Sequence, residues 1–126
     1  DVINIRGHRI GSAEVESVLL KDSNIFEVCA IGVPDELEGD LLIVFISSKH
    51  KNLDQVIKKI ITENFGIFAT PKSIYYIPEM PKTRSGKILR RLLRDLYYNP
   101  DIEEMGDLST MVNPKSVNII KQILKN

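Results

Sequence analysis

The sequence has little cysteine, no tryptophan and no excess of either charge. Its single cysteine, Cys29, has no second thiol in the chain with which to form a disulfide. The lack of a disulfide framework favours a reducing compartment, so we expect a cytoplasmic protein, or a nucleocytoplasmic one if the source is eukaryotic. Basic and acidic residues both number 17, which excludes the overall positive field that draws nucleic acid or anionic lipid to a protein. Any attraction for anions must therefore be local.

Long hydrophobic runs are also missing. The longest, LLIVFI at residues 41–46, is far shorter than the roughly 20 residues that cross a bilayer as a helix, so no membrane partner is expected. The first ten residues lack the basic and apolar regions of a signal peptide and the composition of a transit sequence. Because they begin at Asp1 rather than at a methionine, we interpret the chain as an excised domain. Its 126 residues, 43% of them hydrophobic, suit one globular domain.

Hydrophobic periodicity predicts an α+β fold, with a β-hairpin followed by a three-stranded sheet that is packed by helices, and with a C-terminal helix. The predicted elements are a hairpin over 1–10 turning at Arg6-Gly7, a helix over about 13–21, strands over about 25–32 and 41–48, a helix over about 53–65, a strand over about 72–78, a helix from Ser85, and a last helix from Pro114. We expect three parts: the hairpin at 1–10, an α+β core at 11–97, and a tail at 98–126.

Polar residues before three of the helical patterns predict N-caps. Ser12, Asn52 and Asn113 can each accept a hydrogen bond from an N–H of the first turn. The helix after Asn52 has the clearest apolar stripe, which is expected to consist of Leu53, Val56, Ile57, Ile60 and Phe65. The run LLIVFISS is expected to be a central strand, buried on both faces and antiparallel to a preceding strand that stops at Val33-Pro34.

A basic segment, PKTRSGKILRR at 81–91, contrasts with the balanced charge of the whole chain. Residues 82–94 contain six basic side chains and no acidic ones. The Gly-Lys step resembles part of a phosphate-binding P-loop, but that motif needs glycine where Pro81 stands and serine or threonine where Ile88 stands. We expect Lys87 near a helix start, where backbone N–H groups and the helix dipole favour an anion, and where its long side chain can carry charge to another surface.

Two other interpretations of this basic segment are open. It can be a solvated loop followed by an ordinary amphipathic helix, or part of a free-standing module that binds anions or nucleic acid through residues 82–94. Nucleic-acid recognition favours interleaved aromatic residues or a known fold signature, and the segment has neither. We therefore expect no nucleic-acid partner, and salt-dependent binding to DNA or RNA would favour the module instead.

The N-terminal hairpin offers a second candidate site. Gly7 can bring its backbone close to a ligand, with Arg6, His8 and Arg9 as donors around it, or it can serve a plain turn. His8 and His50 have no cysteine or acid at ligand spacing, so no metal site is expected.

Other reactive residue types have structural interpretations. Cys29 lies in a predicted strand and is expected to be a small core residue. The acidic residues cluster at a helix start and at a turn, where they are expected to be surface residues; they are Glu14, Glu16, Asp35, Glu36, Glu38 and Asp40.

Two stretches together, DVINIRGHRIGSAEVES and PKTRSGKILRRLLRDL, resemble the C-terminal domain of the acyl-adenylate-forming enzymes. The resemblance is greatest to the AMP-forming acetyl-CoA synthetases and next to the propionyl-CoA synthetases. It continues through AIGVPDELEGD, GIFATP and GDLSTMVNP and covers nearly the whole chain. It implies a mobile domain that closes, in two orientations, over a large N-terminal domain of the same polypeptide. That N-terminal domain holds the acyl and ATP pockets in this family, and Mg²⁺ is expected to bind there.

The resemblance implies roles for three residues of this chain. Lys87 matches the lysine that bridges the substrate carboxylate and the ATP phosphates during adenylation. Gly7 matches a residue that lines the pantetheine tunnel after the domain rotates, and Arg9 matches an arginine of the same hairpin that supports this second orientation. ATP and coenzyme A are the implied cofactors, and acetate or another short carboxylate is the implied substrate. The implied activity is that of an AMP-forming acetate–CoA ligase, and the isolated domain is expected to be inactive.

Two positions depart from the pattern of the acetyl-CoA synthetases. Arg6 stands where those enzymes usually have a serine near the thiol arm of CoA, and it stays a candidate cofactor-binding residue. Thr62 stands where they often have an arginine for the ribose phosphate of CoA. No CoA role is carried over to Thr62, and either a weaker affinity for CoA or a cation elsewhere is expected.

Overall fold

A computed structural model describes residues 1–102 and 113–126 of the chain. The chain divides into two compact units, Asp1–Tyr76 and Ile77–Asn126. Residues 77–97, which the sequence pattern groups with the α+β core, therefore belong to the second unit. Part of the expected tail, residues 103–112, lies outside the described residues. The α+β class is confirmed.

The first unit is built on one five-stranded sheet. Its strands are β1 (Val2–Ile5), β2 (His8–Gly11), β3 (Ile25–Asp35), β4 (Gly39–Ser48) and β5 (Ser73–Tyr76), and its helices are α1 (Ser12–Leu19), α2 (Asp54–Phe65) and the 3₁₀ helix η1 (Ile67–Ala69). The strand order is β2-β1-β4-β3, with β5 also pairing with β4. Among these pairs, β4–β5 is parallel and the others are antiparallel. The hairpin is thus part of the main sheet, because Ile5 of β1 pairs with Gly39 of β4.

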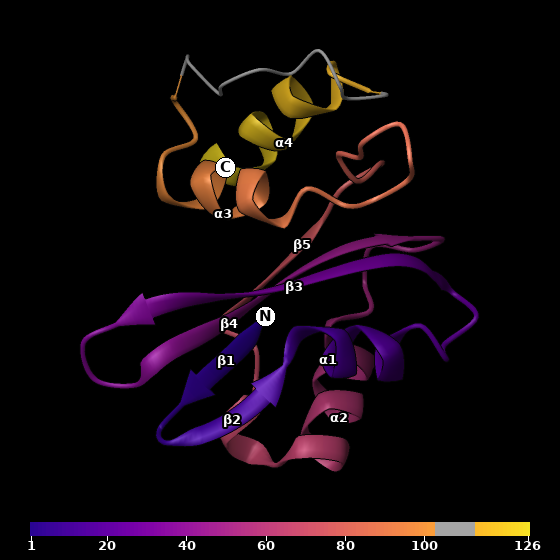
Figure 1. The fold of residues 1–126 in the computed structure, drawn as a ribbon. Helices are drawn as coiled ribbons and strands as arrows, with labels where there is room; N and C mark the ends of the chain where they lie inside the picture. Colours follow the sequence, from indigo (N-terminus) through magenta and orange to yellow (C-terminus); the bar gives the residue numbers. More distant parts are fainter. Residues whose placement is uncertain (103–112) are drawn as a thin grey trace. The chain divides into compact units, whose positions relative to one another are not determined.

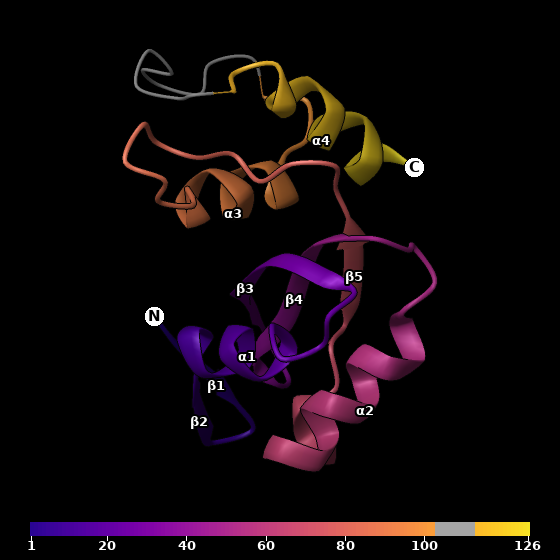
Figure 2. The ribbon, with the colours of Figure 1, turned by 90° about the vertical axis from the view of Figure 1, so that its right-hand side faces the viewer.

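The core of the first unit lies between this sheet and its two α-helices. Figures 1 and 2 show α1 and α2 on the same side of the sheet. Alternate residues of β3 and β4 face the helices, as the two-residue period of a strand requires; the buried cluster includes Val28, Ala30, Leu42, Val44 and Ile46 from the strands with Val15, Leu19, Ile57 and Ile61 from the helices. Every residue from Leu42 to Ser47 is buried, which confirms the prediction of a central strand for LLIVFISS.

The predicted end of the first long strand is wrong. β3 continues through Pro34 to Asp35, where Pro34 pairs with Asp40 and Asp35 with Gly39. Proline is tolerated here because β3 is the last strand in the sheet order, so its missing N–H removes no bond to a further strand. The turn between β3 and β4 therefore contains only residues 36–38.

Two predicted caps in the first unit are also wrong. Gly11 is the N-cap of α1, and the Ser12 side chain is buried without a hydrogen-bond partner among the described residues. Leu53 is the N-cap of α2, and its N–H donates to the Tyr76 hydroxyl at 2.9 Å. That hydroxyl donates in turn to Asp54. The Tyr76 side chain, which comes from the sheet, thus accepts a hydrogen bond from the start of α2, where the sequence suggested Asn52 as a local cap.

The α2 stripe and one acidic residue also differ from expectation. Ile61 is fully buried while Val56 is 40% exposed, because the buried face follows the i, i+4, i+8 spacing of Leu53, Ile57 and Ile61. Glu16, expected at the surface, is only 9% exposed. Its carboxylate accepts a hydrogen bond of 2.9 Å from the Ala30 N–H and so joins α1 to β3.

The second unit contains α3 (Arg90–Tyr98) and α4 (Ser116–Lys125). Its buried hydrophobic side chains come mainly from these two helices, with others from the segment before α3; they include Ile77, Met80, Leu92, Leu93, Leu96, Val117 and Ile120. The helix predicted from Ser85 begins only at Arg90, because residues 82–88 form a loop that is closed by an antiparallel bridge between Lys82 and Ile88. Lys115 is the N-cap of α4, so the cap predicted at Asn113 is wrong. None of the described helices is long and apolar enough to span a bilayer.

Two turn glycines allow a matched test of the sheet. Gly7 and Gly39 have φ of +84° and +87°, but a Cβ at Gly7 would meet no atom within 4 Å, whereas at Gly39 it would lie 2.8 Å from the Asn4 carbonyl oxygen. We expect Gly7→Ala to lower the free energy of unfolding by about 1–2 kcal/mol through backbone strain alone. Gly39→Ala should cost at least about 1 kcal/mol more in urea unfolding. Equal losses would show that β1 and β4 are less closely apposed than described.

Candidate functional site

Lys87 lies on a tight loop of the second unit. Lys82 and Ile88 form an isolated antiparallel bridge, and the Thr83 N–H donates to the Lys87 carbonyl at 2.9 Å. At the tip, the Gly86 N–H donates to the Thr83 carbonyl at 2.9 Å, and Gly86 has a φ of +89°. This reversal explains why no helix begins at Ser85. Lys87 therefore follows a β-turn, and the prediction that places it at a helix start is wrong.

Side chains fix the backbone of this loop while leaving the lysine exposed. The Lys87 N–H donates to Thr83 Oγ1 at 3.2 Å, and Thr83 Oγ1 lies 2.9 Å from Ser85 Oγ. Lys87 itself is exposed, and its ammonium has no hydrogen bond or ion pair with the residues that the structure describes. An ordered backbone thus presents a solvated positive charge.

Asn113 anchors the base of the same loop. Its Nδ2 donates to the Met80 carbonyl at 2.8 Å, and its Oδ1 accepts from the Lys82 N–H at 3.3 Å. The Leu89 N–H closes the loop by donating to the Pro81 carbonyl at 3.0 Å. The residue predicted to cap α4 thus holds the segment that carries Lys87.

The basic residues of 82–94 are not equally accessible. Those with exposed side chains are Arg84, Lys87 and Arg91, while Lys82, Arg90 and Arg94 are half-buried. Leu92, Leu93 and Leu96 of the same helix are buried, which confirms its predicted amphipathic character.

The hairpin of the first unit presents the second set of predicted site residues. Ile5 pairs with His8, so Arg6 and Gly7 form a two-residue turn, as predicted. Both have positive φ, 50° and 84°, which is typical of the type I′ turn that suits the twist of a hairpin. Because a Cβ at Gly7 would meet nothing within 4 Å, the backbone there is open to an approaching ligand.

Arg6 does not point freely into solvent. Its guanidinium makes a two-point ion pair with the Glu38 carboxylate, in which Nη2 donates to Oε1 at 2.9 Å and Nε donates to Oε2. The Arg6 N–H also donates to the Glu38 carbonyl at 2.7 Å. The hydrogen bond from Arg6, helped by the opposite charge, holds the pKa of Glu38 below its ordinary value, and the same partner raises the pKa of Arg6.

The neighbours of the turn have different environments. The His8 ring stacks on Phe68 with centroids 4.0 Å apart, so the face of the His8 ring is used in packing. Arg9 pairs with Asn4 in the hairpin, and its side chain is exposed. A hollow of about 590 Å³ lies beside the turn; it is lined in part by Arg6, Glu38, Leu37, Ile67 and Lys72.

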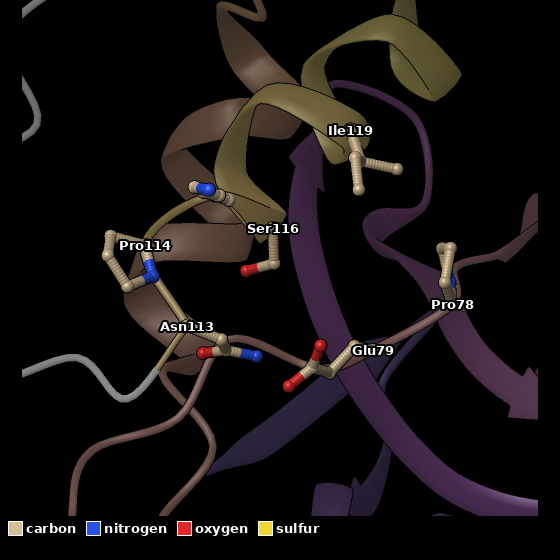
Figure 3. Close-up of a pocket in the computed structure, with 7 residues that line it drawn as sticks. Pro78, Glu79, Asn113, Pro114, Ser116 and Ile119 are labelled. Carbon is tan, nitrogen blue, oxygen red and sulfur yellow. The ribbon is translucent and has the colours of Figure 1, made fainter.

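A separate pocket of about 380 Å³ lies within the second unit. Figure 3 shows Glu79, Asn113, Ser116 and Ile119 around it, and Pro78, Pro114 and Lys115 also contribute to its lining. The Ser116 hydroxyl is buried and has no partner among the described residues. None of the residues predicted for catalysis or cofactor binding lines this pocket.

Within the described residues, the predicted site falls into two groups. Arg6, Gly7 and Arg9 share one hairpin of the first unit, and Lys87 stands on the loop of the second. Thr62 lies within α2, where its hydroxyl donates to the Lys59 carbonyl. Cys29 is buried in β3 and forms no disulfide, in agreement with its predicted place in the core.

No group of three or more His, Cys, Asp or Glu side chains that could hold a metal ion is found in the part of the chain that the structure describes.

Two residues that shape these groups are not apparent from the sequence. Glu38 is predicted only as a surface acid, and nothing in the local pattern links it to Arg6, which lies 32 positions earlier. Thr83 carries no signal of its own, although a threonine hydroxyl close in sequence is a common acceptor for backbone N–H groups in turns.

Several known proteins are similar to this chain in sequence and fold. A family model described as the AMP-binding enzyme C-terminal domain matches residues 14–87. Acetyl-coenzyme A synthetase 2 of Candida albicans is 38% identical over 124 residues, which span 93% of this chain and 18% of that protein. Acetyl-coenzyme A synthetase of Coprinopsis cinerea is 40% identical over 135 residues, which span 97% of this chain and 20% of that protein. The chain thus has about a fifth of the length of these curated relatives.

A solved structure agrees with these relatives. The crystal structure of an acyl-CoA synthetase from Brucella canis superposes with a TM-score of 0.68 at 35% sequence identity. The match covers 75% of this chain and 18% of that one.

The support that Thr83 gives to the Lys87 backbone can be tested by amide exchange. Thr83→Val removes the oxygen that accepts from the Lys87 N–H, so we expect Lys87 amide exchange to accelerate about fivefold, which corresponds to one ordinary hydrogen bond. Thr83→Ser keeps the oxygen and should retain protection. NMR-detected hydrogen exchange measures both, and unchanged protection in Thr83→Val would contradict the described bond.

The ion pair of the hairpin turn should appear in a pH titration. Arg6 lowers the pKa of Glu38 in the folded protein. The ion pair therefore stabilises the fold at pH values above the pKa of an unfolded glutamate, and this stabilisation is lost as the pH falls through the pKa of folded Glu38. Arg6→Ala should therefore move the Glu38 midpoint upward in a carboxyl ¹³C NMR titration. An unmoved midpoint would show that the two side chains are not paired in solution.

Proposed function

Because the chain belongs to the family of AMP-binding enzyme C-terminal domains, we propose that it is the catalytic C-terminal domain of an AMP-forming acetyl-CoA synthetase. The full-length enzyme would convert acetate, ATP and CoA into acetyl-CoA, AMP and pyrophosphate. The observation that carries the proposal is the position of Lys87, an exposed ammonium on a loop whose backbone is fixed by its own hydrogen bonds. The identity to two acetyl-coenzyme A synthetases along nearly the whole chain supports the choice of substrate class.

In the first half-reaction, a carboxylate oxygen of acetate attacks the α-phosphorus of ATP, and pyrophosphate leaves. Both reactants are anions, so their approach is opposed by charge. An ammonium placed between the carboxylate and the phosphates lowers this repulsion and stabilises the charge that develops in the transition state. The fixed loop allows Lys87 to supply that charge at little cost in backbone ordering.

In the second half-reaction, the thiol sulfur of CoA attacks the acetyl carbonyl carbon, the bond to the phosphate oxygen breaks, and AMP leaves while the thiol proton is lost. For this step, the hairpin turn would supply an open path for the thiol arm of CoA and an exposed basic residue. Gly7 has no side chain and its backbone is open, so an extended thiol arm can pass close to it. Arg9, exposed on the same hairpin, is available to hold the second orientation of the domain.

The partner of this domain is proposed to be the N-terminal domain of the same polypeptide, which would hold acetate, most of ATP and the Mg²⁺ that accompanies its phosphates. This agrees with the short span of the chain relative to its relatives. We propose no role for Thr62 in binding CoA, since its hydroxyl is used within its own helix.

The proposal predicts a split between the two half-reactions. In the full-length enzyme, Lys87→Ala should reduce acetate-dependent ATP–pyrophosphate exchange by about 10²–10³-fold, the usual loss when one stabilising donor is removed. Formation of acetyl-CoA from supplied acetyl-adenylate should stay near the wild-type rate. With purified full-length enzyme, the rate of pyrophosphate exchange and the rate of acetyl-CoA formation from acetyl-adenylate can each be measured over a series of substrate concentrations.

Arg84→Ala is the matched control, because Arg84 is an exposed basic residue of the same loop. It should leave pyrophosphate exchange within about threefold of wild type, since the residual charge effect of an exposed residue is small. Equal losses in Arg84→Ala and Lys87→Ala would point to a diffuse basic surface instead of one catalytic ammonium. Equal loss of both half-reactions in Lys87→Ala would also contradict the assigned role.

A further inference from the structure

Arg6 has an unusual backbone conformation for its residue type. Among the described residues it is the only non-glycine with positive φ, at 50°. An L-residue with a Cβ adopts this left-handed region at a cost, and it persists where the surroundings hold it. The contacts of Arg6 should therefore explain why the turn stays in this shape.

Glu38 supplies every described polar contact of Arg6. The backbone N–H of Arg6 donates to the Glu38 carbonyl at 2.7 Å, and the guanidinium makes the two-point ion pair with the carboxylate of the same residue. Main chain and side chain are thus held by one partner. A two-point Arg–carboxylate pair fixes orientation as well as distance, which a single lysine contact would not do.

Glu38 is itself held in place by its own turn. Asp35 Oδ2 accepts from the Glu38 N–H at 2.9 Å and from the Leu37 N–H at 3.1 Å. Asp35 belongs to β3 and pairs with Gly39, and Gly39 pairs with Ile5 at the end of β1. The contacts therefore run without a gap from the end of the β3–β4 ladder, through the β3–β4 turn, to the hairpin turn.

We propose that the Arg6–Glu38 pair is a latch that positions the hairpin turn, so that Arg6 is a positioning residue and not a ligand of CoA. The latch sets the backbone of Gly7, the next residue along the chain. Its effect on catalysis rests on the function proposed above. If the turn is already held in one shape, its backbone does not have to become ordered when the thiol arm of CoA binds beside Gly7. Adenylation, assigned to Lys87 in the second unit, does not involve the latch.

The exposure of the pair sets the expected size of its effect. The side chain of Arg6 is 64% exposed and that of Glu38 26%, so water and salt screen the attraction. Asp35 opposes the pairing slightly through its like charge, and Lys72 lines the same hollow. An effect of a few fold, reduced by added salt, is therefore expected rather than an all-or-none loss.

Glu38→Gln in the full-length enzyme tests the latch, because it removes the charge while keeping the size of the side chain. Hydrogen exchange at the Arg6 amide, which donates to the Glu38 carbonyl, should accelerate about fivefold. The rate of acetyl-CoA formation from supplied acetyl-adenylate at low CoA should fall by a similar factor, through a higher KM for CoA. Acetate-dependent pyrophosphate exchange should stay at the wild-type rate.

Two further variants separate positioning from general charge effects. Glu36→Gln removes the same charge from an exposed neighbour in the same turn and should change neither readout. The reversed pair, Arg6→Glu with Glu38→Arg, should recover much of the amide protection and of the thioester rate. Raising the salt concentration should bring the thioester rates of wild type and Glu38→Gln closer together, because salt screens the Arg6–Glu38 attraction that only the wild type has.

The latch is overturned if Glu38→Gln matches Glu36→Gln in amide exchange and in the thioester step. It is also overturned if the reversed pair exchanges its turn amides as fast as Glu38→Gln, because paired charges would then not hold the turn. If neither wild type nor any variant forms acetyl-adenylate, the proposed function fails on its own. The amide exchange of the turn would still decide for or against the latch in that case.

Discussion

The antiparallel pairing of β3 with β4 is the interaction on which the first unit depends. It runs from Ile25 and Ser48 at one end to Asp35 and Gly39 at the other. β5 pairs directly with β4, β1 pairs with it at Gly39, and β2 follows through β1. Because alternate residues of the pair face one way, the same ladder creates the apolar surface that α1 and α2 cover.

The register of that ladder also decides where the hairpin turn lies. Since Gly39 ends one long pair and meets Ile5, the three-residue turn after β3 comes beside the two-residue turn after β1. In the second unit, the antiparallel bridge between Lys82 and Ile88 decides in the same way where the turn before Lys87 lies. In both places a tight turn fixes the backbone and leaves one position accessible, which reduces the ordering required when a reactant arrives.

Local patterns in the sequence predict the strands, the amphipathic helices and the hairpin turn because each depends on nearby residues. The period of two in VINIRGHRI and the central apolar run indicate strands that the structure confirms. Features that depend on distant partners are not predictable in this way. The Glu16 carboxylate is buried because it accepts from the Ala30 N–H, 14 positions away, and the start of α2 meets Tyr76 instead of Asn52.

The candidate site shows the same division. Lys87, Gly7 and Arg9 follow from motif resemblance, which depends on residue types and spacing. The loop that holds Lys87 has the pattern of a helix, and Gly86 within that pattern does not by itself indicate a reversed turn. The partner of Arg6 could not be predicted, because the acid that pairs with it becomes its neighbour only once β1 and β4 are in register.

The two hydrogen bonds of Asn113 have a consequence for how this domain tolerates shortening. Its amide completes the surroundings of Met80 and Lys82 from a position more than 30 residues downstream. A premature stop ahead of Asn113 would spare every residue of the lysine loop, yet it would remove the donor to the Met80 carbonyl and the Asn113 acceptor of the Lys82 N–H. A remote stretch of the polypeptide therefore acts as a tether for a loop to which it contributes no residue.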